Sequence, residues 1–393
     1  MQTEPGLLSL PPLSLYVHLP WCVKKCPYCD FNSHAVAGAI PAEDYIVALL
    51  ADLENELPLV WGRVVHSVFF GGGTPSLFSA RQIAVMLQGI RSRVSLAPAA
   101  EVTLEANPGT VEHDSFMAYL EAGVNRVSLG VQSFDDPTLA RIGRVHGRAE
   151  AERAIAAIHD SGLKHFNVDL MYGLPGQSVA GAVHDVRRVV DLGVPHVSHY
   201  QLTLEPNTAF FARPPQLPDD ERCWEMQQAC AGIFQRAGLE QYEISAWSLP
   251  HHRCRHNLNY WRYGDYIGIG AGAHGKLSLP AQDEIRRMSR HRHPQAYLKA
   301  LGTGDWLAES RAVGPVDRVF EFFLNQLRLR GGAHLQDLAP RTGLPLQSIG
   351  HLINEAGARK LAELRADRLV PTALGWRFLN DLQALFLPPT DTS

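Results

Sequence analysis

The sequence predicts an α/β protein built on a partial (β/α)6 TIM-like barrel, with a smaller winged-helix-like domain at its C-terminal end. Three observations support this fold class. Short apolar runs of strand length alternate with amphipathic helical segments, as parallel βαβ crossovers require. Polar and glycine-rich residues gather directly after these runs, where an α/β barrel places its site. Beyond about residue 280 the pattern changes to helices followed by a hairpin.

The segments expected to form the barrel follow one another in a regular order. The expected strands are residues 15–19, 64–70, 102–105, 126–131, 167–171 and 196–202. Between them, apolar residues recur at helical spacing, in residues 42–57, 80–94, 114–122, 149–161 and 179–192. Glycines follow three of these helices, at the position where a left-handed cap is favoured: Gly123, Gly162 and Gly193. Six successive strands whose C-terminal ends carry polar residues at the same end of the fold favour a barrel over an open sheet.

The change of pattern divides the chain into a core, residues 1–280, and a C-terminal unit, residues 281–393. In the second unit we expect helices at 316–329, 335–342 and 346–362, then a hairpin at 364–378 with Gly375 near its turn or edge. This order is typical of a winged helix, and a plain helical cap is the alternative. Basic and acidic residues are interleaved here, which argues against binding to nucleic acid: Arg359, Lys360, Arg365 and Arg368 alternate with Glu355, Glu363 and Asp367.

Composition excludes several classes of function. The chain has 36 basic and 40 acidic residues, a balance that favours neither nucleic acid nor an anionic membrane. We expect no secretory signal in residues 1–20 and no membrane span, because no apolar run reaches about 18 residues. Three of the six cysteines lie within eight residues, which indicates metal binding in a reducing compartment. We therefore expect a cytoplasmic protein with at most peripheral membrane association.

The three clustered cysteines form the most informative motif. Cys22, Cys26 and Cys29 follow the first expected strand with the spacing C-x3-C-x2-C. Thiolates select zinc, copper(I) or iron–sulfur clusters. Zinc usually takes four protein ligands, and His18 and His34 are the nearby candidates for a fourth. A [4Fe–4S] cluster normally takes four cysteines, so three would leave one iron open to a small ligand. We favour the cluster, with a zinc loop or three unconnected thiols as alternatives.

This cysteine motif after a first barrel strand resembles the signature of the radical S-adenosylmethionine (SAM) superfamily. Residues 70–75, FGGGTP, also resemble that superfamily's glycine motif after the second strand. In the superfamily the open iron binds the amine and carboxylate of SAM, and an electron from the cluster cleaves SAM to a 5′-deoxyadenosyl radical. The resemblance therefore implies a [4Fe–4S] cluster on Cys22, Cys26 and Cys29, bound SAM, and a reductant such as flavodoxin or ferredoxin.

Over nearly its full length the chain resembles the oxygen-independent coproporphyrinogen III oxidase group, through residues 16–22, 104–108, 129–133 and 169–175. In this chemistry a carboxylate can accept hydrogen bonds from ribose hydroxyls, an arginine can pair with the SAM carboxylate, and a tyrosine can face the adenine. The carboxylates could equally cap neighbouring helices. The resemblance places these residues around SAM: Tyr16, Tyr28, Gly72, Gly73, Thr74, Glu105, Gln132, Arg144 and Asp169. Arg141 competes with Arg144, and Gln201, Ala273 and His274 also fall at strand ends.

Two features depart from the oxidase pattern. The oxidases have a further cysteine two residues after the third, and this chain has Phe31 there. Residues 256–261, HNLNYW, instead resemble the heme chaperone branch of the group. This resemblance implies that the protein binds heme and delivers it to acceptors such as respiratory proteins. His256 would then be the axial ligand, with Tyr260 and Trp261 against the macrocycle. His251, His252 and Cys254 are rival ligands, and a loop-capping role for His256 is the alternative.

Three functions follow from these patterns. The first is a heme chaperone that carries a [4Fe–4S] cluster, SAM and heme, without the oxidase activity. The second is an oxygen-independent coproporphyrinogen III oxidase that forms protoporphyrinogen IX by radical SAM decarboxylation. The third is a binding protein in which the cluster only stabilises the fold. Cys223 and Cys230 are seven residues apart on an expected helix, so we expect them to share a buried face rather than bind metal.

Overall fold

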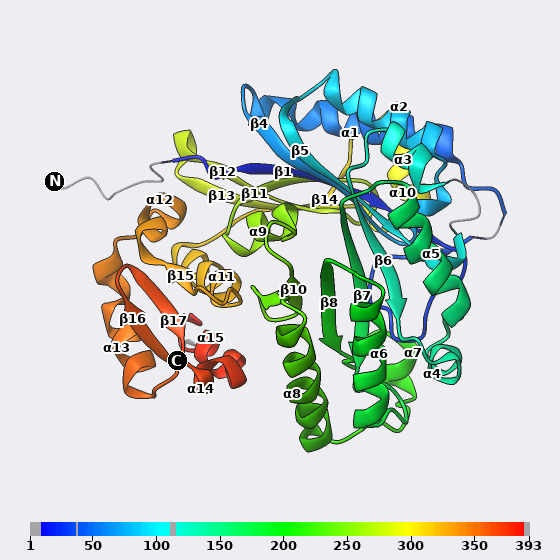
Figure 1. Ribbon diagram of the computed structural model, residues 1–393. Helices are drawn as coiled ribbons and strands as arrows, with labels where there is room; N and C mark the ends of the chain where they lie inside the picture. The colour runs from blue at the N-terminus through cyan, green and yellow to red at the C-terminus, as the bar shows by residue number, and fades with distance from the viewer. Residues whose placement is uncertain (1–8, 37, 111–114, 389–393) are drawn as a thin grey trace.

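A curved, mixed sheet of 12 strands forms the centre of the protein (Figure 1). The computed structural model describes residues 9–36, 38–110 and 115–388. Strands follow the order β14-β13-β12-β11-β1-β4-β5-β6-β7-β8-β10-β9 across the sheet. None of the helices within these residues is both long and apolar enough to cross a membrane.

The six strands expected from the sequence are all present, and they are adjacent and parallel in chain order. The sheet stays open, because the last of them pairs with β10 rather than with the first. The partial barrel is thus confirmed. The six strands are β1 (Leu13–Leu19), β4 (Val64–Gly72), β5 (Ser95–Ala106), β6 (Arg126–Gln132), β7 (His165–Tyr172) and β8 (His196–Gln201).

The helices expected between these strands are also present. Ser79, Ser115 and Ser178 begin three of them with side-chain caps, which satisfy free backbone N–H groups. The expected start of one helix at residue 114 lies outside the described residues. The short α4 (Asp136–Arg141), capped by Asp135, is an addition to the prediction. The expected helices are α1 (Ala42–Val60), α2 (Ala80–Arg91), α3 (Phe116–Glu121), α5 (Arg148–Asp160) and α6 (Val179–Asp191).

The sheet continues beyond the six-strand barrel on both sides. On one side β10 (Ala246–Ser248) and β9 (Glu240–Gln241) follow β8, after α7 (Ala209–Ala212) and α8 (Asp220–Arg236). On the other side β11 (Asp265–Ile269) runs parallel to β1. Three antiparallel strands then extend the sheet, with α10 (Pro294–Lys299) between the last two: β12 (His274–Leu279), β13 (Glu284–Arg290) and β14 (Leu307–Ala312). Since β13 and β14 lie beyond residue 280, we propose a domain boundary near residue 313.

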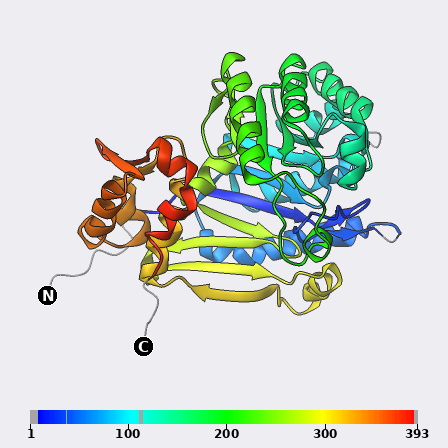
Figure 2. The same ribbon diagram turned by 90° about the horizontal axis from the view of Figure 1, so that it is seen from below.

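The C-terminal unit has its own small core and a three-stranded sheet, β15-β17-β16. In Figure 2 it lies to one side of the large sheet. Phe323 and Phe386 stack at 3.9 Å in its core, and the element order agrees with a winged helix. The elements are α11 (Pro315–Gln326), β15 (Ala333–His334), α12 (Leu338–Thr342), α13 (Gly350–Ala358), β16 (Ala362–Arg365), β17 (Arg368–Pro371), α14 (Ala373–Arg377) and α15 (Leu379–Ala384).

The expected hairpin is shorter than the sequence pattern suggested. It ends at Pro371, and its turn contains Ala366 at a φ of 52°. Gly375 lies in α14 rather than near the turn. A Cβ atom at Gly375 would lie 1.7 Å from the carbonyl oxygen of Leu361. Glycine is therefore required here for helix packing, not for a turn.

Alternation along β1 separates the hydrophobic core from the barrel interior. Leu13, Leu15, Val17 and Leu19 are at most 1% exposed and belong to the main core. Because successive strand residues point to opposite faces, the intervening Ser14, Tyr16 and His18 share the other face. That face lines the cavity described below.

Candidate cofactor site and adjoining cavity

The three clustered cysteines lie on the loop that leaves β1. Cys22 belongs to the short β2 (Trp21–Cys22), which pairs with β3 (His34–Ala35). The backbone N–H of Cys29 donates to the carbonyl oxygen of Cys26 at 3.1 Å, which closes a turn between them. All three are free and half-buried, whereas the other three cysteines are free and buried. The loop thus presents three accessible thiols.

Polar groups from separate parts of the chain surround these thiols. Arg144 Nη1 donates to Cys26 Sγ at 3.7 Å. The Ser33 hydroxyl lies 3.8 Å from Cys29 Sγ, and Thr74 and Ser33 hydrogen bond with the Cys22 thiol. Burial raises the pKa of the Cys22 and Cys29 thiols, and the hydroxyl donors oppose this shift by stabilising the thiolate, the form that binds metal. The donor set therefore fits an iron–sulfur cluster.

A single metal ion fits this loop less well. Within the described ranges, no three His, Cys, Asp or Glu side chains come close enough to hold one ion. A zinc ion needs all its cysteine ligands within about 2.3 Å, whereas each cysteine of a cluster binds a different iron. His18, a candidate fourth zinc ligand, has both ring nitrogens engaged, by Tyr16 and by the carbonyl oxygen of Asn32. His34, the other candidate, keeps its Nε2 without a hydrogen-bond partner among the described residues, so it is the separation of the side chains that disfavours the zinc loop.

The glycine motif holds the end of β4 against the cysteine loop. Gly73 N donates to Leu19 O at 2.8 Å, and Thr74 N donates to Trp21 O at 2.7 Å. A Cβ atom at Gly73 would lie 2.4 Å from Trp21 O. At Gly72, with a φ of 118°, a Cβ atom would lie 2.5 Å from the His18 ring. Both glycines allow backbone approaches that a side chain would block.

Two buried carboxylates, Glu105 and Asp169, interact electrostatically within the barrel. Burial and the nearby Asp169 raise the pKa of Glu105 to about 8, although Gly72 N donates to its Oε2 at 3.1 Å. Burial likewise raises the pKa of Asp169, against hydrogen bonds from Asn167, Ser198 and Ser128. Two buried carboxylates that interact are costly to ionise together, although the nearby Arg144 charge partly opposes the rise in the pKa of Asp169. A positively charged ligand such as SAM would relieve that cost.

This raised pKa predicts that Glu105→Gln stabilises the protein more at pH 8 than at pH 5. Glu105 stays protonated in the folded state up to about pH 8 but ionises near 4.5 when unfolded. The folded state therefore binds more protons, and its stability falls as pH rises between these values. We expect a gain of at least about 1 kcal/mol at pH 8 from thermal unfolding. Glu54→Gln, which removes an exposed partner of Arg93, is the control. An equal effect at both pH values would contradict the assignment.

The remaining residues expected around SAM lie near these groups. Gln132 has a φ of 72°, a strained conformation for a non-glycine residue, and its Oε1 accepts from Tyr200 OH at 2.9 Å. Arg144 also donates to Gly130 O, and its Nε is buried without a partner. Arg141 instead bonds to backbone oxygens of Pro137 and Pro175. Of the two arginines, only Arg144 is therefore placed at the cysteine loop.

Tyr28 lies within the cysteine loop and packs into a small apolar cluster. Its ring is 6.5 Å from that of Phe210. Burial, opposed by the nearby Arg144 charge, keeps the pKa of the Tyr28 hydroxyl raised, so it stays neutral. The aromatic face expected for adenine is thus present beside the thiols.

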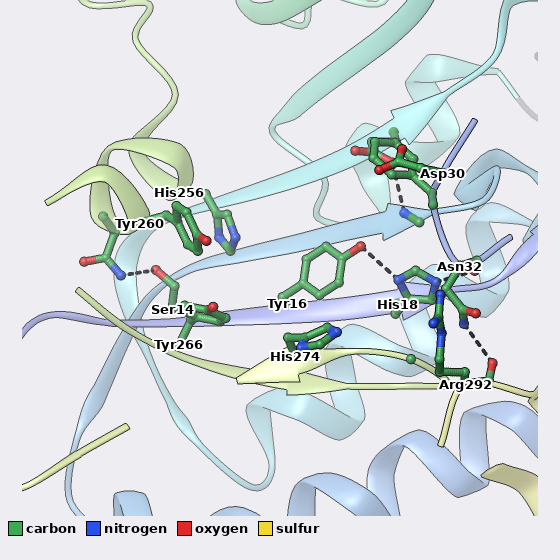
Figure 3. A pocket seen from close by; sticks show the side chains of 15 residues that line it. Ser14, Tyr16, His18, Asp30, Asn32, His256, Tyr260, Tyr266, His274 and Arg292 are labelled. Carbon is green, nitrogen blue, oxygen red and sulfur yellow. Dashed lines mark hydrogen bonds between the residues drawn. The ribbon is translucent and has the colours of Figure 1, made fainter. Parts of the chain in front are cut away.

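A cavity of about 670 Å³ opens from this site towards α9 (Arg255–Trp261). Figure 3 shows His256 and Tyr260 at one end and Asp30, Asn32 and Arg292 at the other. Tyr16, Gly72 and Glu105 contribute to the wall between them, as do residues that the sequence did not single out: Ser14, Tyr266 and Asn259. The cavity therefore joins the end of the cysteine loop to the HNLNYW segment.

His256 is held in one orientation within this cavity. Its ring is 4.9 Å from that of Phe69, and its Nδ1 is 3.0 Å from Ser67 Oγ. Ser67 Oγ donates to Ser14 Oγ at 2.8 Å, so its lone pair is left to accept from Nδ1–H. Burial lowers the pKa of His256 to about 4. The ring is then neutral with an unprotonated Nε2, the state in which imidazole ligates a metal.

The two aromatic residues of the HNLNYW segment, Tyr260 and Trp261, lie in different surroundings. Trp261, expected against the macrocycle, lies outside the cavity lining and packs 4.2 Å below the Arg328 guanidinium. Tyr260 does line the cavity, near Tyr266 at 5.3 Å. Trp261 is thus a correction to the prediction. An i+5 spacing places it on a different side of the helix from His256.

The rival ligands do not share the cavity with His256. His251 lines a second cavity, and the His252 ring lies 4.9 Å from that of His165. Cys254 is buried with its thiol directed to Glu101. Cys223 and Cys230 share the buried face of α8, as expected. Among the later strand-end residues, His274 lines the cavity, whereas Gln201 and Ala273 do not.

Sequence reasoning missed several cavity residues for a common reason. Tyr266 reaches the cavity from β11 and Arg292 from the loop after β13, in the part of the sheet past β1, which no local pattern revealed. His18 carried a signal, because it shares the face of Tyr16 in β1. Ser67, which does not line the cavity but contacts His256, carried none, as it is a small residue within an apolar strand.

Comparison with known proteins agrees with this geometry. Residues 16–189 match the model for the radical SAM superfamily, and residues 314–378 match that for the HemN C-terminal domain. The chain is 49% identical to heme chaperone HemW of Escherichia coli, over 97% of this chain and 100% of that protein. It is 48% identical to heme chaperone HemW of Haemophilus influenzae, over 96% and 99% of the two chains. The protein of that name from Mycobacterium tuberculosis is 36% identical, over 96% and 95%.

Among solved structures, the coproporphyrinogen III oxidase HemN of Escherichia coli, described as a radical SAM enzyme, has the same fold. Its TM-score is 0.80 at 21% identity, covering 96% of this chain and 90% of that one. This likeness supports the architecture of the sheet.

Proposed function

We propose, from the premise that the chain belongs to the HemW family within the radical SAM superfamily, that it binds heme beside a SAM-bearing cluster and passes the heme to acceptor proteins. The observation that carries this proposal is the cavity between the cysteine loop and His256. At about 670 Å³ it falls within the usual range for cofactor sites. It combines one oriented imidazole, aromatic walls and a polar end that carries Arg292 beside Asp30 and Asn32.

Each end of the cavity offers what heme requires. His256 Nε2 would ligate the iron, and Tyr260 and Tyr266 would pack against the macrocycle. Arg292 lies at the end away from His256 (Figure 3), where it would pair with a propionate, and His274 lies between the two ends. The heme would therefore lie with its polar edge towards the cysteine loop.

The residues around the thiols would hold the second cofactor pair. Cys22, Cys26 and Cys29 would ligate a [4Fe–4S] cluster, which supplies one-electron chemistry when bound. Glu105 and Asp169 would balance the positive charge of SAM, and Arg144 would face its carboxylate. The hydrogen bonds from Tyr16 to His18 and from His18 to Asn32 O connect the cavity wall with the loop that follows Cys29. A change of charge at the cluster would therefore change the electrostatic potential along the heme cavity.

Partners and location complete the proposal. Heme acceptors would be respiratory proteins, and the reductant would be flavodoxin or ferredoxin. The protein would work in the cytoplasm, with peripheral membrane contact where its acceptors require it, and without nucleic acid. The net charge of −4 agrees with the absence of a nucleic-acid surface.

Coproporphyrinogen III oxidation is the second candidate, because the same cavity adjoins the cysteine loop and would also admit a tetrapyrrole. The reconstituted protein should be incubated without oxygen with coproporphyrinogen III, SAM and a reductant. We expect no protoporphyrinogen IX, since Phe31 stands where the oxidases have a cysteine. A coproporphyrinogen oxidase assayed in parallel is the positive control. Product formation at a comparable rate would contradict the chaperone proposal.

A further inference from the structure

The two largest fully buried side chains of the described residues are arginines in opposite situations. Arg290 is 0% exposed and lies between two carboxylates, 3.0 Å from Asp52 and 2.8 Å from Glu56. Arg126 is 2% exposed, and no carboxylate in the described part of the chain comes within 4.0 Å of it. A buried charge without a counter-charge is strongly destabilising.

The local contacts of Arg126 leave its charge uncompensated. Arg126 begins β6, and its Nη1 donates to the carbonyl oxygen of His252 at 3.0 Å. Its Nη2 is buried with no hydrogen-bond partner. One neutral oxygen does not replace a carboxylate, since a guanidinium offers five donors suited to two-point pairing. The arrangement therefore provides hydrogen-bond donors suited to an anion.

Arg126 lines the second cavity, of about 780 Å³, which lies beside the middle of β5 and the starts of β6 and β7. The cysteine loop follows the other end of the strands, so this cavity is distinct from the heme site. Its lining contains three arginines against two carboxylates, together with two histidines and an apolar part: Arg126, Arg253, Arg255, Glu101, Glu240, His165, His251, Ala99, Pro250 and Leu258.

The other charged groups of this cavity are already paired. Arg253 lies 3.2 Å from Glu240, and Arg255 lies 3.8 Å from Glu101 and also donates to Ala99 O. Glu101 accepts from the Cys254 thiol and from two backbone N–H groups at the start of α9. Neither carboxylate is therefore free to neutralise Arg126, and the cavity keeps one excess positive charge.

We propose that this cavity binds an organic anion whose carboxylate or phosphate group pairs with Arg126. The apolar part of the lining favours an organic ligand over a bare inorganic ion, because it offers surface for a hydrocarbon portion. Glu101 holds the N–H of His256 at 2.9 Å, so the ligand would lie beside the segment that carries the heme ligand. This site does not depend on the proposed function.

Thermal unfolding of the full chain with added anions tests the site. Citrate and inorganic phosphate serve as carboxylate and phosphate probes, each against chloride at equal ionic strength. We expect one of them to raise the Tm in a saturable way, and the probe that does so identifies the group recognised. No saturable response to either probe would overturn the proposal.

Arg126→Met separates a ligand role from a structural one. If Arg126 serves a ligand, the variant should lose the anion response and unfold at the same or a higher temperature without anions, since a buried unpaired charge is removed. If Arg126 only supports the loop through His252 O, the variant should unfold at a lower temperature and keep the response. That second result would overturn the proposal.

Arg253→Gln gives a second test that does not disturb a buried position. The Arg253 side chain is 46% exposed at the rim, and its loss should weaken anion affinity about threefold in calorimetric titration. Arg359→Gln is the matched control, since it removes a similarly exposed Arg–Glu pair in α13 and its C-cap. Equal affinity in the Arg253 and Arg359 variants would count against the site.

Discussion

Replacement of Cys26 by serine is expected to abolish the [4Fe–4S] cluster while the barrel stays folded. Serine offers a hard oxygen in place of a soft thiolate, and only two cysteines of the loop would remain. Cys26 is half-buried on a loop outside the hydrophobic core, so the loss of stability should stay below about 1 kcal/mol. Iron and sulfide content after anaerobic reconstitution, with visible absorption and thermal unfolding, would show both effects.

Cys223→Ala is the matched control for that result. Cys223 is also a free cysteine, but it lies on the buried face of α8. We expect it to keep the full iron content and to lose stability instead, because a buried side chain becomes smaller. Full iron content in Cys26→Ser, or its loss in Cys223→Ala, would contradict the assignment of the cluster to the loop.

Gly73→Ala is expected to have the second largest effect, by separating the glycine motif from the cysteine loop. The added Cβ would meet the Trp21 backbone at 2.4 Å, and no side-chain rotation can relieve contact with a carbonyl oxygen. Either Trp21 shifts, and Cys22 with it, or β4 moves away from β1. We expect a loss of about 1–3 kcal/mol together with reduced cluster content.

Gly181→Ala tests whether this effect belongs to the site. Gly181 lies in α6, and a Cβ there would have no neighbour closer than 3.5 Å. Alanine is the better helix former by about 1 kcal/mol, so this variant should be as stable as the natural protein or more so. Equal behaviour of the two variants would contradict the role given to Gly73.

The barrel could be predicted because its signals are local. The parallel strands carry long apolar runs, and amphipathic helices follow five of them, three with a serine side-chain cap. The cysteine spacing and the glycine motif are also contained in short segments. All six strands and the approach of residues 72–74 to the cysteine loop follow from such patterns.

The rest of the site depends on contacts between distant parts of the chain. Strand β11 pairs with β1 across about 250 residues, and this pairing brings Tyr266 and Arg292 to the cavity. The position of Trp261 under Arg328 depends on the packing of the C-terminal unit. Gly375 shows the same limit, since a turn and a close helix contact both require glycine.

The electrostatic features of the sites could not be predicted from the sequence either. The excess charge at Arg126 and the opposed carboxylates Glu105 and Asp169 emerge only when burial and partners are known. The sequence around an arginine or a glutamate in a strand is the same whether or not its side chain has a partner of opposite charge in the folded protein. Two of our predictions rest on this difference.

Heme titration of the natural protein and of His256→Ala tests the central claim most directly. The change in Soret absorption should show saturable binding to the natural protein, with affinity at least about tenfold lower in His256→Ala. His251→Ala, which changes a histidine of the other cavity, should bind as the natural protein does. No heme binding by the natural protein, or equal affinity in His256→Ala, would contradict the account.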